Sequence, residues 1–394
     1  MTPATALQHL VRFGNGSDYK SIEAPEGPYP VYGSGGEFAR ATEYLHEGES
    51  VLFGRKGTVD RPLYVNGRFW TVDTMYYTVP GPQVEPKFLY YWATTIPFDL
   101  YSTNTALPSM TSGMLGRLQF PLLERKHQRH IADYLDRETA TIDALIEKQM
   151  SLIAGLIERR RATVSKSVVT GLHGSAVRCT GDTYFPRIAD TWQLQPLGYG
   201  YDVVLGKMLD AKRASQDGDT ELPYVRAANI KDGYLDLEDV NSMAYTPYEV
   251  MRLDLRAGDL LVVEGGSVGQ SALLKEPMSG WSFQKTVNRV RSRRQWSTAY
   301  LHYVLSHMRA RGHFDLICSG STIAHLTAEK LRAVKIPVPP PAEQREIVAF
   351  LDRETAKIDA LIAKAERFIE LAQERRAALI TAAVTGQIEI PTED

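Results

Sequence analysis

Two glycine-rich stretches are the first places in this sequence where backbone groups could hold a ligand. Residues 31–38 read VYGSGGEF, and residues 263–270 read VEGGSVGQ. Neither stretch has the lysine and spacing of a phosphate-binding P-loop, and neither has the strand–turn–helix context of a dinucleotide fold. We therefore expect tight turns here and no nucleotide site.

The residue types that usually carry catalysis or bind metal show no recognisable spacing. The nine histidines form no H-x-x-x-H pair, and the two cysteines, Cys179 and Cys318, are too far apart in the chain to suggest zinc ligands. A nucleophile-elbow pattern is absent, as is the [DN]-P-P-[YF] stretch with which amino-methyltransferases hold a flipped base. The sequence favours a binding protein with no catalytic residue, no metal and no cofactor of its own.

Composition sets the broad class. The chain has 394 residues, 43% hydrophobic and 23% charged, and a net charge of -2. This length favours two or three domains, and the lack of an apolar run of 18 residues or of an export signal predicts a cytoplasmic, non-membrane protein with reduced cysteines in its core. A DNA-binding protein of this charge balance would have to concentrate its cations on some faces.

The elements that must position any site are duplicated. Residues 134–146 read YLDRETATIDALI, residues 350–362 read FLDRETAKIDALI, and eleven of these thirteen positions are identical. A fainter match upstream aligns residues 47–60 with residues 256–269. Each copy is a glycine- and aromatic-rich globular part, a junction that is proline-rich in the second copy, and a long helical pattern. The second copy also has a longer preamble, DTWQLQPLGYGYD, than the first.

Each helical part carries one apolar seam at coiled-coil spacing. Prolines at 339–341 mark the start of the second helix, and Gly171 and Gly386 are suitable left-handed stops. Each helix should be about 43 residues, roughly 65 Å long, and should pair antiparallel with the other copy. The predicted helix-pairing residues are Leu135, Ile142, Leu145, Leu152, Leu351, Ile358, Leu361 and Phe368.

The fold class predicted is α+β, with two globular domains in tandem, each followed by a long helix, and a pseudo-two-fold antiparallel coiled coil. The expected boundaries are 1–120 for the first globular domain, 121–171 for its helix, 172–336 for the second domain, 337–386 for its helix and 387–394 for a tail. Repeated charges such as Arg137, Glu138, Arg353 and Glu354 are either solvated flanks of the seam or a docking face for another subunit.

This organisation resembles the specificity subunit of Type I restriction-modification systems. The resemblance rests on two divergent globular domains and on the repeated segment, which in the second copy reads PPPAEQREIVAFLDRETAKIDALI and leads into ERR and VTG. It implies a DNA reader in which each domain recognises one half of a bipartite double-stranded site. It also implies that the helices set the spacer and hold two adenine methyltransferase subunits, which carry S-adenosylmethionine. A restriction subunit using ATP and Mg joins where the system cleaves DNA.

Candidate DNA contacts are basic or small polar residues in or beside loops. In the first domain they are Lys20, Arg40, Arg55, Lys56, Asn104 and Thr105; in the second they are Lys207, Lys212, Arg213, Arg226, Lys285, Arg289, Arg291, Ser321 and Thr322. Strand alternation in KTVNRVRSRR would place Lys285, Arg289, Arg291 and Arg293 on one face. For each cation the alternative is an ordinary solvated charge, and for each small polar loop it is a capping loop.

Two other classes of protein remain open at this point. An enzyme acting alone would need a catalytic constellation, and methylation of DNA by the purified chain would reveal one. A coiled-coil scaffold without a role in DNA recognition would explain the helices, but it would not explain two large domains that diverged while the helices stayed alike.

Overall fold

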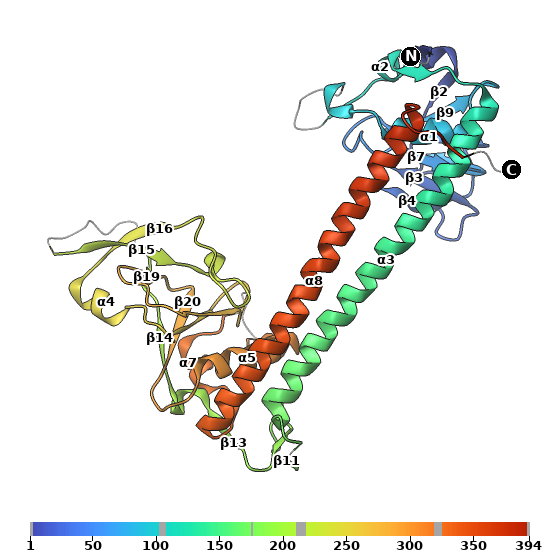
Figure 1. Cartoon of the computed structure of the whole chain (residues 1–394). Coiled ribbons are helices and arrows are strands. Elements are labelled where there is room, and N and C mark those ends of the chain that lie inside the picture. The colour runs from blue at the N-terminus through green and yellow to red at the C-terminus, as the bar shows by residue number, and fades with distance from the viewer. Residues whose placement is uncertain (1–2, 102–107, 175, 210–217, 319–324, 392–394) are drawn as a thin grey trace. The chain divides into compact units, whose positions relative to one another are not determined.

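A computed structural model describes residues 3–101, 108–174, 176–209, 218–318 and 325–391. The chain divides into two compact units, the first made of Met1–Ser151 and Ala365–Asp394 and the second of Leu152–Lys364. Each unit holds one α+β globular domain and a part of each of two long helices, α3 (Arg125–Thr170) and α8 (Pro341–Val384) (Figure 1). The predicted α+β class with two long helices is confirmed, and the division into units cuts both helices, which the sequence analysis had counted as separate segments.

The globular part of unit 1 contains two four-stranded sheets. The first has the order β2 (Val11–Asn15), β9 (Met75–Pro80), β6 (Ser50–Gly54), β7 (Leu63–Val65), and the second β4 (Gly36–Ala41), β3 (Tyr29–Gly33), β8 (Arg68–Thr71), β5 (His46–Glu47). Short helices α1 (Pro86–Thr94), α2 (Ser112–Arg117), η1 (Leu7–His9) and η2 (Phe98–Leu100) and the strand pair β1 (Ala4–Ala6) with β10 (Gln119–Pro121) complete it. Every residue of β6 is buried, so this strand lies at the centre of the core.

The globular part of unit 2 has the same central sheet. Its strand order is β14 (Tyr201–Leu205), β20 (Val287–Ser292), β17 (Leu260–Val263), β18 (Ser271–Leu273), beside a sheet of β16 (Asn241–Tyr245), β15 (Thr220–Val225) and β19 (Ser282–Phe283). Smaller pairs are β13 (Gln193–Pro196) with β21 (Lys335–Val338), and β11 (Val177–Cys179) with β12 (Arg187–Ala189). The helices are α4 (Pro247–Arg252), α5 (Thr298–Ala310), α6 (His313–Ile317), α7 (Ala328–Ala333), η3 (Leu197–Tyr199) and η4 (Ala227–Asn229).

Strand register confirms the duplication. Tyr77 of β9 lies opposite Leu52 of β6, just as Arg289 of β20 lies opposite Leu261 of β17. The β1–β10 pair of unit 1 corresponds to the β13–β21 pair of unit 2. The preamble of the second domain therefore has a counterpart in the first, and the hairpin β11–β12 is the part that unit 2 has in addition.

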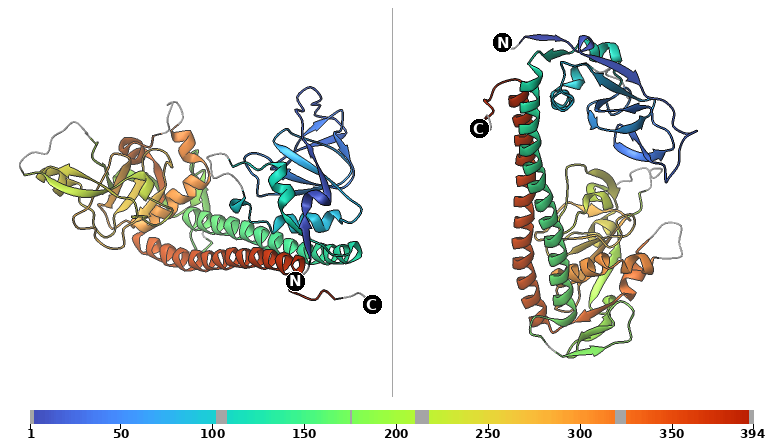
Figure 2. Two further views of the ribbon diagram at one scale, coloured as in Figure 1. Left: turned by 90° about the horizontal axis from the view of Figure 1, so that it is seen from above. Right: turned by 90° about the vertical axis from the view of Figure 1, so that its right-hand side faces the viewer.

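The two long helices pair antiparallel within each unit. In unit 1, Ile131 and Leu135 of α3 share a hydrophobic cluster with Ile380 and Val384, near the end of α8. Both views of Figure 2 show the two helices side by side. The start of one helix lies beside the end of the other, which confirms the predicted direction of pairing.

The same arrangement recurs at the other end of the helices, in unit 2. There Val164 and Val168, near the end of α3, cluster with Ile347 and Leu351, near the start of α8. Gly171 and Gly386 follow the helices with φ of 73° and 71°, so both predicted left-handed stops are confirmed.

Cross-helix ion pairs use the repeated residues reciprocally. Asp143 of α3 accepts a hydrogen bond from Arg376 of α8 at 2.9 Å in unit 1, and Asp359 of α8 accepts one from Arg160 of α3 at 3.0 Å in unit 2. Each aspartate belongs to a copy of IDALI and each arginine to a copy of ERR. Each helix therefore offers the same acid and the same base to the other, which accounts for part of the repetition.

The helix-pairing prediction is right for four residues and wrong for four. Leu135, Ile142, Leu351 and Ile358 are buried, whereas Leu145, Leu152, Leu361 and Phe368 are exposed by 42%, 49%, 52% and 41%. The heptad that contains the four buried residues continues through Ile146 and Ile153 in α3 and through Ile362 and Ile369 in α8, which are half-buried. Each exposed side chain comes one position before one of these isoleucines, so it flanks the seam instead of filling it.

Another part of the repeat attaches each helix to its own globular domain. Asp136 accepts hydrogen bonds from Tyr91 and Lys87 of α1, and Asp352 accepts one from Tyr303 of α5. In both units a buried threonine follows three residues later. The aspartate of LDRETA is thus used within each unit, so partner subunits are not needed to explain its repetition.

A buried glutamine performs the same task at each helix start. The amide of Gln128 accepts a hydrogen bond from the backbone N–H of Glu85, and the amide of Gln344 accepts one from the backbone N–H of Ser297. Each glutamine also donates to a carbonyl group just before its own helix, that of Leu123 or Pro339. The helix and the globular domain are therefore joined by equivalent polar contacts in both copies.

Two further expectations concern the cysteines and membranes. The prediction that both cysteines lie in the core is confirmed for Cys318, which is buried, and wrong for Cys179, which is exposed on β11. Within the described part of the chain, no helix combines the length and apolar character needed to cross a membrane.

Candidate nucleic-acid interface

The turn after β6 carries two exposed candidate cations of unit 1. Arg55 and Lys56 are exposed, and the Arg55 guanidinium lies 5.8 Å from the centre of the Tyr76 ring. The backbone N–H of Arg55 donates to Thr74, and its carbonyl accepts from Met110. A rigid backbone with exposed cationic side chains suits contact with a phosphate backbone.

The shape of this turn depends on a glycine. A Cβ at Gly54 would overlap the carbonyl of Thr58, so a larger residue would open the turn. The turn is also anchored from the other side, because the backbone N–H of Gly57 donates to the carbonyl of Pro108 at 2.9 Å. The stretch is a fixed turn that displays side chains.

The other cations predicted in unit 1 are engaged locally. Lys20 is well exposed and pairs with Glu23 at 3.3 Å. Arg40 donates to the carbonyls of Gly27 and Pro28 and pairs with Glu37 at 3.0 Å. Both side chains reach the surface, and their role in DNA binding stays a prediction.

The equivalent turn of unit 2 carries no cation of its own. Glu264 and Gly265 stand where unit 1 has Arg55 and Lys56, and the same backbone bonds hold them: Glu264 donates to Thr286, and its carbonyl accepts from Leu326. The Glu264 carboxylate lies 3.0 Å from His325. The two units therefore share the turn and differ in its charge.

The predicted DNA contacts at Arg289 and Arg291 of unit 2 are not supported by the structure. Arg289 is 4% exposed and donates to the carbonyls of Arg252 and Asp254 at 3.0 and 2.8 Å. Arg291 is bound through two nitrogens by Asp259, at 2.6 and 2.7 Å. Both guanidinium groups hold the domain together internally, so the prediction that they lie on a DNA-facing strand surface is wrong.

The buried charges perturb one another. Burial lowers the pKa of Arg289, and the nearby charge of Arg291 lowers it further, while the surrounding aspartates oppose both effects. Burial alone would raise the pKa of Asp254, but hydrogen bonds and charges from Arg256 and Arg291 hold it below its ordinary value. The surroundings therefore favour the ionised form of Asp254 and disfavour the charged form of Arg289.

Lys207 is also internal. Its side chain is 10% exposed, its ammonium group donates to Glu249 and to the carbonyl of Ala244, and it lies 5.0 Å from the centre of the Tyr245 ring. Glu249 in turn caps α4 by accepting from the backbone N–H of Thr246. Lys207 therefore positions α4, and the prediction of a direct DNA contact is wrong for it.

Of the remaining predicted cations, Lys285 is exposed. Arg226 is 28% exposed and pairs with Asp239, while Arg293 is 60% exposed and pairs with Asp202 at 2.7 Å. The predictions for Asn104, Thr105, Lys212, Arg213, Ser321 and Thr322 lie outside the described residues.

A basic hollow of about 810 Å³ lies between α3 and α5 in unit 2 and was not among the predicted sites. Five cationic side chains line it: Arg160, Arg161, Lys166, Arg309 and Arg311. They come from RRRATVSK and HMRARGH, two basic runs about 150 residues apart. Those runs were the available signal, but they resemble ordinary solvated helix charges until the fold brings them together.

Comparisons with known proteins identify the family. The family model described as Type I restriction modification DNA specificity domain matches residues 10–153 and 192–370. These two matches cover most of the chain, one in each copy of the duplication. The chain belongs to the family of Type I restriction-modification specificity subunits, whose role is recognition of the DNA target.

Individual relatives agree with this assignment. A putative type I restriction enzyme specificity subunit from Haemophilus influenzae is 22% identical over 371 residues, which is 90% of this chain and 88% of that protein. A chain from a structure of type I restriction-modification complex assembly covers 98% of this chain and is itself fully covered, with 17% identity and a TM-score of 0.74. The HsdS subunit of Thermoanaerobacter tengcongensis covers 98% of this chain, with 94% of its own length matched, 16% identity and a TM-score of 0.53. The structural matches support the fold.

Proposed function

We propose that this chain reads a bipartite DNA site, with one half recognised by the globular domain of each unit. Membership of the specificity-subunit family supports a role in DNA recognition. The proposal that the site has two halves rests on a comparison of the two units of this chain. The two units share strand order and register, yet the equivalent turns at Arg55 and Glu264 carry opposite charge. Domains with one framework and different exposed loops suit the reading of two different half-sites.

We propose further that α3 and α8 set the length of the unspecified spacer and hold two methyltransferase subunits, which methylate adenine with S-adenosylmethionine. Each helix runs through both units. Four repeated positions near LDRETA are exposed in both copies, at Arg137, Ala140, Ala144 and Leu145 and at their equivalents. Because these exposed positions recur in both copies, they suit a partner that binds once per copy.

The chain itself is proposed to contribute no catalytic group. Methyl transfer would belong to the modification subunits, and ATP- and Mg-dependent cleavage to a restriction subunit. Purified chain incubated with DNA and S-adenosylmethionine should give no methylated adenine, and adding the methyltransferase subunit should restore it. Methylation by the chain alone would contradict this assignment.

The spacer proposal has a direct test in helix length. Four residues inserted after Ser151 in α3 and four after Arg367 in α8 would lengthen both helices by about 6 Å. The antiparallel register places these two points opposite each other, since it pairs Asp143 with Arg376 and Arg160 with Asp359. Coiled coils accommodate four-residue insertions by local unwinding.

Genome-wide mapping of methylated adenines should then show a longer spacer between unchanged half-sites. A four-residue insertion at the exposed turn of Gly280 serves as the control and should leave the spacer unchanged. An unaltered spacer in the helix variant, with methylation retained, would rule out the helices as the determinant of spacing.

A further inference from the structure

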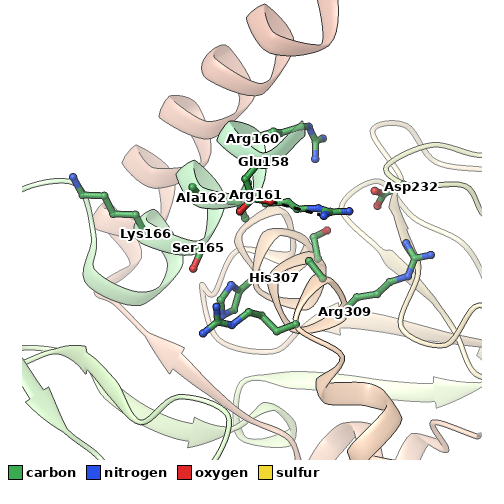
Figure 3. A pocket seen from close by; sticks show the side chains of 13 residues that line it. Glu158, Arg160, Arg161, Ala162, Ser165, Lys166, Asp232, His307 and Arg309 are labelled. Carbon is green, nitrogen blue, oxygen red and sulfur yellow. Dashed lines mark ion pairs between the residues drawn. The ribbon is translucent and has the colours of Figure 1, made fainter. Parts of the chain in front are cut away.

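The basic hollow of unit 2 is built by α3 and α5 with a contribution from the loop that contains Asp232. Figure 3 shows the side chains of Arg160, Arg161 and Arg309 directed toward the side of the hollow where Asp232 lies, while Lys166 points away. Ser165 adds a hydroxyl group from α3. The hollow therefore presents several guanidinium groups on one side.

The balance of charge in the hollow is positive. Its carboxylates are Glu158, which lies 3.9 Å from Arg161, and Asp232; Arg160 is paired with Asp359 at 3.0 Å. Within the described residues, no carboxylate forms an ion pair with Arg309 or Arg311. These two arginines lie at the C-terminal end of α5, where the helix dipole favours cations, and Arg309 also shares a smaller hollow with Asp315.

Histidine does not add to this charge at neutral pH. Burial, together with the charges of His313 and Arg311, lowers the pKa of His307 to about 4. The positive charge of the hollow therefore comes from arginine and lysine, which stay protonated across the physiological range.

A comparison between the units links the hollow to the turn already described. Arg309 also lines a smaller hollow of about 290 Å³ together with Gly266, Ser267 and Val268 of the turn after β17. In unit 1 the equivalent turn has its own cations, Arg55 and Lys56. Each unit therefore has exposed cations at the same turn, supplied by the turn in unit 1 and by α5 in unit 2.

Arg161 and Arg309 are specific to unit 2. The upstream repeat aligns Arg309 with Pro97, and the equivalent ion pairs of Arg160 and Arg376 align Arg161 with Ala377, so neither residue has a basic counterpart in the other copy. A partner that binds the same repeated surface in both units would not need them. Their position beside a domain-specific turn connects them with the ligand of that domain.

We propose that Arg161, Arg309 and Arg311 bind the sugar–phosphate backbone of duplex DNA next to the half-site read by unit 2. The inference rests on the proposed function and assigns a backbone-contact site within it. Guanidinium groups are suited to phosphate oxygens because they donate in a planar fork. The contact carries no sequence information; it contributes affinity and orientation.

The test uses the full chain co-purified with its methyltransferase subunit, and the double substitution Arg161→Ala/Arg309→Ala. Fluorescence anisotropy measures binding to a duplex containing the methylated target and to an equally long duplex without it, over a series of salt concentrations. The matched control, Arg187→Ala/Lys275→Ala, removes the same charge from other exposed positions of unit 2.

The double variant should bind both duplexes about tenfold more weakly at moderate salt, and the slope of log affinity against log salt should fall by about 2. The methylated sequence should stay the same. The control should retain the wild-type slope. Affinity and slope equal to those of the control would overturn the proposal.

Other outcomes separate this site from the alternatives. Loss of methyltransferase binding with an unchanged salt slope would identify the hollow as a protein-docking site and overturn the proposal. A changed half-site sequence would mean that these arginines read bases and would overturn it too. If the wild type does not distinguish target from non-target duplex, the proposed function fails, while the slope on non-target DNA still decides the role of the hollow.

Discussion

The central sheets of the two units carry very different side chains at one equivalent strand position. In unit 1 this position is Tyr77, whose ring stacks on His46 at 4.9 Å and meets Phe69 edge-on at 6.3 Å. In unit 2 it is Arg289, a nearly buried guanidinium held by Asp254 and backbone carbonyls. The same backbone thus accepts an aromatic cluster or an ionic network, provided that the neighbouring residues change as well.

The change on the neighbouring strand is visible. Gly14 pairs with Tyr77, and a Cβ at Gly14 would overlap the Tyr77 ring, whereas Val204 pairs with Arg289. A bulky ring therefore requires glycine on the next strand, and a long flexible side chain leaves room for valine. At this pair of positions the two copies therefore differ in a matched way.

The largest effect is expected at the acid of the ionic network. Asp259 is buried and binds Arg291 through both oxygens, so Asp259→Ala would leave a partly buried guanidinium without its main partner and should lower the free energy of unfolding of unit 2 by about 3–5 kcal/mol. Its counterpart in unit 1 is Ser50, a neutral hydrogen-bonding residue. Ser50→Ala should cost about 1–2 kcal/mol. Denaturant unfolding measures both, and equal losses would contradict the contrast between an ionic and a neutral interior.

A smaller effect is expected from exchanging the strand partner. Gly14→Val would force the Tyr77 ring to move and should destabilise unit 1 by about 1–3 kcal/mol. Adding Tyr77→Ala should recover part of the loss, because the cavity left by the ring accepts the valine. Thermal unfolding of the single and double variants gives the coupling, and purely additive effects would mean that the two positions did not change together.

The smallest effect is a difference in acid sensitivity. The folded-state pKa of Asp254 and of Glu249 lies below the ordinary value, so the stability they contribute is complete above about pH 5 and is lost as the pH falls through the lowered values. Both carboxylates belong to unit 2. Pepsin at pH 3 should therefore cut near β20 before it cuts near β9, as peptide mapping would show, and preferential cleavage near β9 would count against the prediction.

The sequence was most informative where one copy could be compared with the other. The repeat predicted α3 and α8 and their antiparallel pairing because helix formation and the heptad depend on local spacing. The seam was misplaced at Leu145 and Leu361 because two apolar residues stand side by side in LI, and spacing alone did not show that the isoleucine faces the partner. The exposure of Leu145 and Leu361, beside the half-buried Ile146 and Ile362, settles which frame is used.

The candidate site was less predictable because the sequence does not show whether a charged side chain is buried in an ion pair or exposed to solvent. Strand alternation in β20 suggested one cationic face, but the partners Asp254 and Asp259 lie more than thirty residues away from Arg289 and Arg291. Only the fold shows whether a cation meets an acid or solvent. For the same reason Arg161 and Arg309, which are far apart in the sequence, gave no sign of a shared hollow.

Unit 1 is built from two separate stretches of the chain, and this affects the order in which the units can fold during synthesis. Unit 2 is one continuous stretch, whereas the core of unit 1 includes Ile380, Ala383 and Val384 from the end of α8. The apolar surface of Ile131 and Leu135 must therefore wait for the end of α8 to leave the ribosome, and unit 1 is completed after unit 2. A truncation shortly before Ile380 would consequently damage the first domain of the chain and leave the later one intact.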